Sequence, residues 1–359
     1  MAEGAPDLGF SADVIAEASR YEGFVLGRVV AQHRGLFRVL TEHSDVHAEV
    51  SGKFRFTSAS LQDYPAVGDF VMIDRDESDA GNAMIHHVLP RNSVFSRRAA
   101  GTAHEVQVVA ANIDRVFICM SLNNDFNPRR LERYLAITWN SGAIPVVVLT
   151  KSDLCDELDD RLRQTAQLAP GVDVIVTTSM TEDGYTALLG CLGTGQTVAF
   201  VGSSGVGKST LINRLLGADV IATRQIRGDD RGRHATTRRE LFAVPTGGAV
   251  IDTPGMRELG LDSADLARAF GDIDALSADC KFRDCAHGTE PGCAVRQAID
   301  DGVLPESRLD SYRKLNREAG YEGLNSRQIE NLKVTEMYSS HGGRKNARAF
   351  IKSREDRDK

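Results

Sequence analysis

The chain has 359 residues, of which 42% are hydrophobic and 26% are charged, and its formal net charge at pH 7 is −7. This length and composition suit roughly two to three globular domains and argue against a mainly disordered chain. The acidic balance excludes a protein that binds nucleic acid over its whole surface, so any RNA contact requires local basic patches. No run approaches the ~18 apolar residues of a membrane span, and Met1 to Ser11 lack the features of a secretion signal, so we expect a soluble, cytoplasmic protein without membrane contact.

Residues 1–20 form a predicted N-terminal extension, and residues 21–98 have the pattern of a small β-barrel. Short apolar runs are separated by glycines, as in a series of strands joined by turns; these runs begin at Val25, Phe37 and Phe70. We expect an OB-fold for this region, although the sequence alone does not separate it from an SH3-like barrel.

Residues 105–270 change to an alternation of strands and helices. The predicted strands are mostly apolar, and they are Arg115–Met120, Ile144–Leu149, Val172–Val176, Thr197–Val201 and Ala249–Ile251. Pro128–Asn140 has helical spacing of its apolar residues. Continuous apolar strands between helices predict an α/β domain whose parallel sheet is covered on both faces.

A complete phosphate-binding motif, G-x-x-x-x-G-K-[ST], lies between one of these strands and a helical run that includes Thr210. It consists of Gly202, Ser203, Ser204, Gly205, Val206, Gly207, Lys208 and Ser209. The glycines allow the backbone N–H groups and the helix N-terminus to face an anion. We expect Lys208 to reach the outer phosphates as a catalytic group and Ser209 to ligate Mg²⁺. A chance glycine-rich turn is the alternative, but the strand and helix around the motif argue against it.

The sequence Asp252-Thr253-Pro254-Gly255 follows the last predicted strand of this domain. Asp252 is positioned to hold Mg²⁺ directly or through water, and the Gly255 N–H group can sense the γ-phosphate of a bound nucleotide. Pro-Gly is also ordinary turn chemistry, but the position after a strand downstream of the phosphate loop favours the functional interpretation.

A motif that reads guanine precedes the phosphate loop in the chain: Thr150, Lys151, Ser152 and Asp153. The carboxylate of Asp153 can accept hydrogen bonds from guanine N1–H and N2–H₂, a pair of donors that adenine lacks. We expect Lys151 to pack its stem over the base, and Ser179, in a polar loop after another strand, to lie near guanine O6. Ordinary GTPases have the phosphate loop first, so this order indicates a circularly permuted GTPase domain.

Residues 227–239, between the phosphate loop and Asp252, are polar, charged and glycine-bearing. A switch loop of a GTPase needs a threonine that completes the Mg²⁺ shell when the γ-phosphate is present, and Thr236 and Thr237 are the candidates. A merely solvated loop is the alternative. Met256 and Arg257 stand where many GTPases have a water-orienting glutamine, so we expect slow intrinsic hydrolysis.

A cysteine and histidine cluster follows in residues 271–340, which we expect to form a metal-binding domain with helices. Three thiolates and one imidazole, from Cys280, Cys285, His287 and Cys293, satisfy tetrahedral Zn²⁺ and leave no open position, so one structural zinc is expected. The scattered Cys119, Cys155 and Cys191 are expected to be small buried residues. Residues 341–359 form a predicted flexible basic tail.

The permuted order, the GRH-x-T-T segment at 232–237, the DTPG sequence and the cysteine pattern together resemble the RsgA (YjeQ) family over nearly the whole chain. The resemblance implies an OB-fold, a permuted GTPase domain and a zinc domain. It also implies GTP and GDP as ligands and a role in late maturation of the small ribosomal subunit. That subunit and its rRNA would be the partners of a monomer, and the subunit would stimulate hydrolysis.

Two residues depart from the family pattern. Thr150 replaces an asparagine that ties the base loop to the phosphate loop, so guanine specificity should be kept while affinity falls. Ala235 replaces the first threonine of the switch, which leaves Thr236 or Thr237 as the Mg²⁺-linked residue. His234 is the candidate for positioning the attacking water, unless the ribosome supplies the missing group.

Two other functions are alternatives. A P-loop ATPase or small-molecule kinase is disfavoured by Asp153. A nucleotide-gated RNA-binding module without hydrolysis stays an alternative because the glutamine is absent. RNA contacts are expected at a basic exit from the barrel and along the tail, namely at Arg91, Arg97, Arg98, Arg344, Lys345, Arg348, Lys352 and Arg354.

Overall fold

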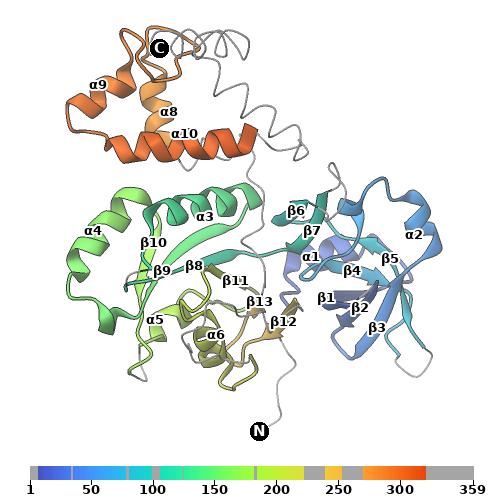
Figure 1. The fold of residues 1–359 in the computed structure, drawn as a ribbon. Helices are drawn as coiled ribbons and strands as arrows, with labels where there is room; N and C mark the ends of the chain where they lie inside the picture. Colours follow the sequence, from blue (N-terminus) through green and yellow to red (C-terminus); the bar gives the residue numbers. More distant parts are fainter. Residues whose placement is uncertain are drawn as a thin grey trace, which may run out of the picture.

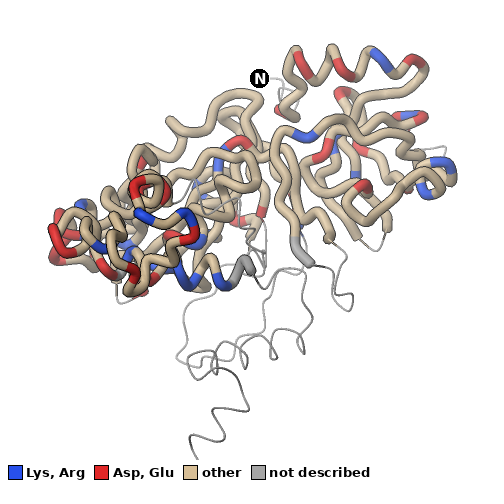
Figure 2. The backbone as a smooth tube through the Cα atoms, turned by 90° about the horizontal axis from the view of Figure 1, so that it is seen from above, with Lys and Arg blue, Asp and Glu red and all other residues tan. Residues whose placement is uncertain are grey.

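The computed structural model describes residues 7–33, 35–77, 81–98, 106–123, 125–181, 184–221, 239–252 and 270–320. A β-barrel lies beside a central α/β domain, and a helical C-terminal domain lies against one helical face of that domain (Figure 1). Lys and Arg are interspersed with Asp and Glu along the described backbone (Figure 2). Among the described helices, none has the combination of length and apolar character needed to cross a membrane.

The barrel is built from β1 (Val25–His33), β2 (Leu36–Leu40), β3 (Asp45–Val50), β4 (Phe70–Ile73) and β5 (Ala83–Val88). The strand order is β1-β2-β3-β5-β4, and β4 pairs back onto β1, so the barrel is closed. This topology, with helix α2 (Gly52–Thr57) and the short helix η1 (Leu61–Asp63) between β3 and β4, is that of an OB-fold. The OB-fold expectation is therefore confirmed over the SH3-like alternative.

Part of the predicted N-terminal extension packs on the barrel. Helix α1 (Ala12–Ala18) begins after Ser11, whose hydroxyl accepts a hydrogen bond from the Val14 N–H group and so caps the helix. Ala18 is buried with Phe70 of the barrel, which places α1 over β4.

One basic residue that was expected to contact RNA has an internal role. The guanidinium of Arg91 forms an ion pair with buried Asp69 at 2.7 Å and donates to the carbonyl oxygens of Gln62 and Tyr64. These contacts hold η1 and Tyr64, which follows it, beside the start of β4. An RNA contact of Arg91 stays a prediction. The side chains of Arg97 and Arg98 and residues 321–359, including the basic tail, lie outside the described residues.

The central sheet has the strand order β10-β9-β8-β11-β13-β12. The strands are β8 (Arg115–Ser121), β9 (Ile144–Thr150), β10 (Asp173–Val176), β11 (Thr197–Gly202), β12 (Glu240–Ala243) and β13 (Ala249–Asp252). All neighbouring pairs are parallel except β12–β13. Helices α3 (Pro128–Ser141) and α4 (Leu158–Leu168) cover one face, and α5 (Thr186–Leu189) and α6 (Lys208–Leu216) cover the other (Figure 1).

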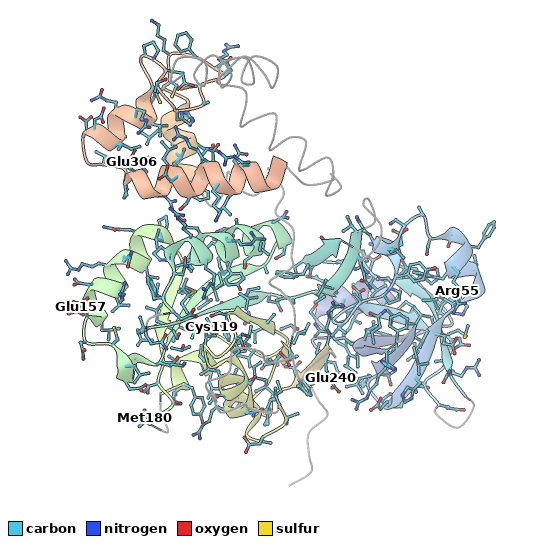
Figure 3. The ribbon with its side chains drawn as sticks, viewed as in Figure 1. Arg55, Cys119, Glu157, Met180, Glu240 and Glu306 are labelled. Carbon is cyan, nitrogen blue, oxygen red and sulfur yellow. The ribbon has the colours of Figure 1, made fainter. Side chains whose placement is uncertain are left out.

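Two connections join the barrel to this sheet. Strands β6 (Val94–Arg98) and β7 (Val106–Ala111) pair with each other across the predicted boundary between the two domains. Strand β12 also pairs with β1, so that eleven described strands form one hydrogen-bonded sheet. Glu240, at the start of β12, lies between the α/β domain and the barrel (Figure 3) and forms a 3.1 Å ion pair with Arg38 of β2.

A buried arginine holds the same junction from within. Arg28 of β1 is 1% exposed and donates to Thr197 Oγ1 at 2.7 Å, to the Leu8 carbonyl oxygen at 2.8 Å, and to the carbonyl oxygens of Gly68 and Asn112. Burial lowers its pKa to about 10, while the nearby carboxylates of three aspartates act in the opposite direction. A buried cation is tolerated here because its donors are used and negative charge surrounds it.

The C-terminal domain consists of α8 (Gly271–Ser277), α9 (Ala294–Asp300) and α10 (Glu306–Gly320). Helix α10 runs along α3 of the α/β domain (Figure 1), and apolar residues of both helices belong to one buried cluster. The guanidinium of Arg308 lies between Glu132 of α3 at 3.3 Å and Asp272 of α8. These contacts fix the C-terminal domain on the α/β domain.

Candidate functional site

The predicted phosphate loop joins the end of β11 to the start of α6. Gly202, Gly205 and Gly207 have φ values of 147°, 79° and 103°, which side-chain-bearing residues rarely adopt. A Cβ atom at Gly202 would meet the carbonyl oxygen of Cys119 at 2.5 Å, so glycine is required there. Cys119 itself is buried beneath the loop (Figure 3), as expected from its sequence context.

Lys208 folds back over this loop. Its Nζ atom donates to the carbonyl oxygens of Gly202 at 2.9 Å and Ser203 at 2.7 Å. This arrangement places a positive charge beside the N-terminus of α6, where backbone N–H groups can bind an anion.

Asp252 ends β13, which is the strand beside β11, so its carboxyl lies at the same edge of the sheet as the phosphate loop. Burial raises the pKa of Asp252 above its ordinary value, and the nearby ammonium of Lys208 acts in the opposite direction. A half-buried carboxyl opposite a lysine can hold a hydrated divalent cation beside a phosphate.

The predicted base-reading motif lies at the end of β9, two strands away from β11. Thr150 is 3% exposed, and its hydroxyl donates to the Val206 carbonyl oxygen of the phosphate loop at 2.6 Å. Lys151 has a positive φ of 59°, and Asp153 lies in the short helix η3 (Ser152–Leu154) that follows. The hydroxyl of Thr150 therefore links the base-reading motif directly to the phosphate loop, which is the connection expected of the residue at this position.

Two residues at the site were missed by the sequence analysis. Thr178 donates from its hydroxyl to Asp153 Oδ1 at 2.6 Å and so orients that carboxylate, whereas the neighbouring Ser179 is exposed. Asp125, in the loop between β8 and α3, accepts a hydrogen bond from the Ser203 hydroxyl. The only sequence signal for either residue is a polar side chain at the end of a strand.

The switch and γ-phosphate-sensing residues fall outside the described residues. His234, Thr236 and Thr237 lie in 222–238, and Gly255 lies in 253–269. Their roles in Mg²⁺ binding and in positioning water therefore stay predictions.

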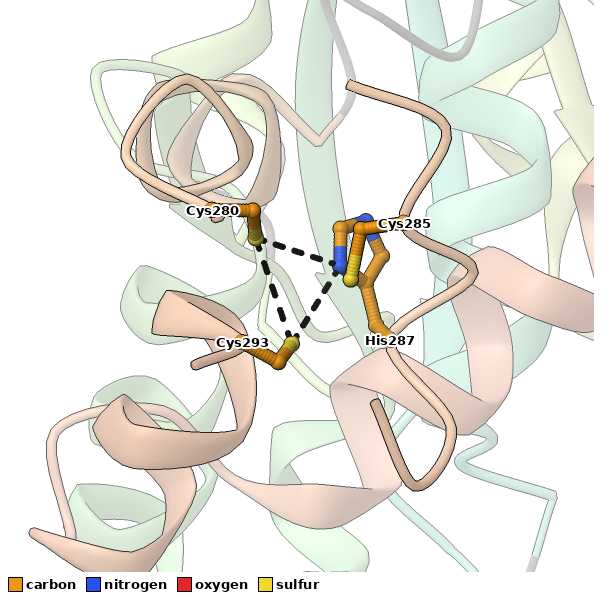
Figure 4. A group of neighbouring side chains, drawn as sticks. All are labelled: Cys280, Cys285, His287 and Cys293. Atoms are coloured by element: carbon orange, nitrogen blue, oxygen red, sulfur yellow. Dashed lines mark hydrogen bonds between the residues drawn. The ribbon is translucent and has the colours of Figure 1, made fainter. Parts of the chain in front are cut away.

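The cysteine and histidine cluster forms a second site, in the loops around α8 and α9 (Figure 4). The ligand atoms of Cys280, Cys285, His287 and Cys293 all lie within 4.8 Å of one another. Cys280 Sγ lies 4.0 Å from Cys293 Sγ, and His287 Nδ1 lies 3.7 Å and 3.5 Å from these two sulfur atoms. Sulfur and nitrogen ligands of a tetrahedral zinc ion would be about 3.5 to 3.8 Å apart. The four side chains therefore fit a metal ion of this kind.

The imidazole of this cluster is fixed through its other nitrogen. His287 Nε2 forms a 3.0 Å hydrogen bond with the Ser277 hydroxyl, which turns Nδ1 towards the cysteines. Burial lowers the pKa of His287 below its ordinary value, which favours the neutral ring that a metal requires.

Known proteins resemble this chain over most of its length. Residues 88–262 match the sequence profile of a family described as RsgA GTPase. The chain is 51% identical over 352 residues to small ribosomal subunit biogenesis GTPase RsgA 2 of Lactiplantibacillus plantarum, covering 98% of each chain. It is 42% identical over 337 residues to RsgA of Methanosarcina acetivorans, covering 92% of this chain and 90% of the relative.

Solved structures show the same fold. YjeQ from Thermotoga maritima superimposes with a TM-score of 0.63 at 27% identity, covering 82% of this chain and 98% of that structure. YloQ, described as a circularly permuted GTPase, superimposes with a TM-score of 0.60 at 25% identity, covering 83% of this chain and 96% of that structure. The chain thus belongs to the RsgA family of circularly permuted GTPases, which are hydrolases of GTP.

Proposed function

We propose that this GTPase acts in late maturation of the small ribosomal subunit, as a cytoplasmic monomer that binds the rRNA of the subunit and is stimulated by it. The observation that carries the nucleotide part is the 2.6 Å hydrogen bond from Thr150 to Val206, which joins a guanine-reading motif to a phosphate loop at one sheet edge. The names of the relatives, small ribosomal subunit biogenesis GTPases, support the partner.

The test is GTP turnover with and without isolated small ribosomal subunits. We expect slow turnover by the protein alone and a marked increase with subunits, because no glutamine follows Gly255 to orient the attacking water. An equal rate in both conditions would remove the subunit from the proposal. The His234→Ala variant should lose the stimulation while it binds GTP nearly normally, and normal stimulation in that variant would exclude His234.

In the proposed nucleotide site, the carboxylate of Asp153, oriented by Thr178, accepts hydrogen bonds from guanine. Lys208 contacts the outer phosphates, and Ser209 holds Mg²⁺ together with Asp252 and with Thr236 or Thr237. A competition assay with GTP, ATP and xanthosine triphosphate tests the base contact. The wild-type protein should prefer GTP, whereas Asp153→Asn should weaken GTP binding and improve binding of xanthosine triphosphate, whose O2 atom accepts a hydrogen bond. An unchanged preference would exclude Asp153 as the base-reading residue.

The metal is proposed to be a single structural zinc held by Cys280, Cys285, His287 and Cys293. Four protein ligands leave no coordination position for water, which a catalytic zinc requires. Elemental analysis of the purified protein should find about one zinc per chain, and a Cys293→Ser variant should lose it. Iron or no metal in the wild-type protein would contradict this part of the proposal.

GTP is further proposed to favour the subunit-bound state, with hydrolysis releasing the protein. The chain enters the C-terminal domain directly after the segment that would sense the γ-phosphate, so nucleotide state and the position of that domain can be linked. Equal affinities for the subunit with GDP and with a non-hydrolysable GTP analogue would show that this link is absent.

A further inference from the structure

The phosphate loop is held by side chains from two neighbouring strand ends. On one side Thr150, at the end of β9, donates to the Val206 carbonyl oxygen. On the other side Asp125, in the loop that follows β8, accepts a hydrogen bond from the Ser203 hydroxyl. The first contact belongs to the base-reading motif, whereas Asp125 belongs to no motif in the sequence.

The carboxylate of Asp125 is itself held in place. Its Oδ2 atom, which accepts from Ser203, also accepts a 2.9 Å hydrogen bond from Arg130 Nη1. Arg130 lies in the first turn of α3, which begins after the capping residue Asn127. The Asp125 N–H group donates to Asn123 Oδ1 at 3.1 Å, so both the backbone and the side chain of Asp125 are fixed.

Ser203 connects Asp125 to the phosphate loop and to Lys208. It is 8% exposed, and its hydroxyl and its carbonyl oxygen bind two different side chains. Its hydroxyl donates to Asp125, and its carbonyl oxygen accepts from Lys208 Nζ at 2.7 Å. A rotation of the Ser203 peptide would therefore move the anchor of the lysine that is expected to contact the phosphates.

We propose that Asp125 is a positioning residue of the GTPase reaction: through Ser203 it fixes the phosphate loop and the ammonium of Lys208. Arg130 balances the charge of Asp125, so that the carboxylate does not repel the phosphates of the nucleotide. A hydrogen bond to an ionised acceptor is stronger than one between neutral groups, which suits a contact that must keep a loop in one conformation.

The test compares Asp125→Ala, Asp125→Asn and Ser203→Ala for GTP affinity and for kcat/KM, with thermal unfolding to show that each variant is folded. Asp125→Ala and Ser203→Ala should each reduce kcat/KM about tenfold, the size expected for a hydrogen bond to a charged group. Asp125→Asn keeps an acceptor for Ser203 and should stay within about threefold of the wild type, as a neutral hydrogen bond replaces a charged one. The matched control is Asp160→Ala, which removes an exposed carboxylate paired with Arg163 on α4 and should change nothing.

The double variant Asp125→Ala/Ser203→Ala decides whether the two residues act together. If Asp125 acts through Ser203, the double variant should lose no more than either single variant, about tenfold in total. Losses that multiply would show that Asp125 acts by another route. Wild-type activity in Asp125→Ala, or an Asp125→Asn variant as impaired as Asp125→Ala, would also overturn the proposal.

The role of Arg130 is tested by Arg130→Gln in the wild-type and the Asp125→Asn backgrounds. In the wild-type background the unbalanced carboxylate should weaken nucleotide binding by up to about fivefold, because exposed ion pairs contribute little. In the Asp125→Asn background there is no charge to balance, so Arg130→Gln should have no effect. An equal loss in both backgrounds would show that Arg130 does not act through Asp125.

Discussion

Replacing Thr150 with valine tests the contact between the base-reading motif and the phosphate loop. Valine has the shape of threonine without its hydroxyl, so the substitution removes the 2.6 Å hydrogen bond to the Val206 carbonyl oxygen with little change in packing. Thr150 is 3% exposed, so water cannot readily replace the lost donor. A buried acceptor left without a partner costs about 1 to 3 kcal/mol.

That cost is divided between the stability of the protein and its affinity for GTP. If it falls entirely on the nucleotide-bound conformation, the Kd for GTP rises by about 5-fold to 150-fold, since 1.4 kcal/mol corresponds to a factor of ten. The Thr150→Asn variant has two N–H donors at this position and should bind GTP at least as tightly as the wild type. Equilibrium titration with a fluorescent GTP analogue measures both.

Thr165→Val is the matched control for this experiment. The Thr165 hydroxyl also donates to a carbonyl oxygen, that of Arg161 at 2.7 Å, and Thr165 is fully buried on α4. It has no contact with the phosphate loop, so its loss should leave GTP affinity unchanged. If Thr150→Val is folded and binds GTP as tightly as the wild type, the hydrogen bond between the two motifs does not contribute to nucleotide binding.

Three further predictions concern the contacts between domains and the metal. Arg308→Met should lower the free energy of opening α10, measured by hydrogen exchange, by about 3 to 5 kcal/mol, because the substitution leaves the buried carboxylate of Glu132 without its ion pair. Adding Glu132→Leu should restore most of this free energy. A double variant as unstable as Arg308→Met would contradict the ion-pair argument. Burial alone would raise the pKa of Asp7, but three backbone N–H donors and Arg28 bring it below 3.8. The stability that this carboxylate contributes is therefore present above pH 3.8, and it is lost as the pH falls through the lower pKa of the folded state. Asp7→Asn should remove this part of the acid sensitivity in denaturation curves. A chelator at neutral pH should expose the amides of 271–304 to exchange while the barrel stays protected, and unchanged protection would show that no metal holds this domain.

Local motifs made parts of the site predictable from the sequence. The phosphate loop needs three glycines with positive φ within six residues, and the metal cluster needs four ligand side chains within fourteen, so both patterns are visible in a short window. The runs of apolar residues predicted the parallel sheet, because strands that are buried on both faces are apolar throughout. In each case the physical requirement is met by residues close together in the chain.

Contacts between distant residues were beyond the sequence. Thr178 meets Asp153 across 25 residues, and Ser203 meets Asp125 across 78, so no spacing rule connects them. Arg91 is a further case, since its ion pair with the fully buried Asp69 joins residues 22 apart in the chain and had no signal in the sequence. The choice between an OB-fold and an SH3-like barrel likewise depends on which strands pair, which apolar alternation does not encode.

The permuted chain order does not alter the nucleotide site, because the site depends on which strand ends meet. Strands β8 to β10 come first in the chain and β11 to β13 come later, and the parallel pair β8–β11 joins the two halves. The hydrogen bonds from Thr150 to Val206 and from Ser203 to Asp125 both connect the earlier half to the phosphate loop of the later half. The chain connection between the halves, residues 177–196 with α5, enters β11 at Thr197, which is the opposite end of this strand from the phosphate loop. The conformation of the phosphate loop therefore depends on side-chain contacts between the two halves, and those contacts are where substitutions should affect GTP binding most strongly outside the motifs themselves.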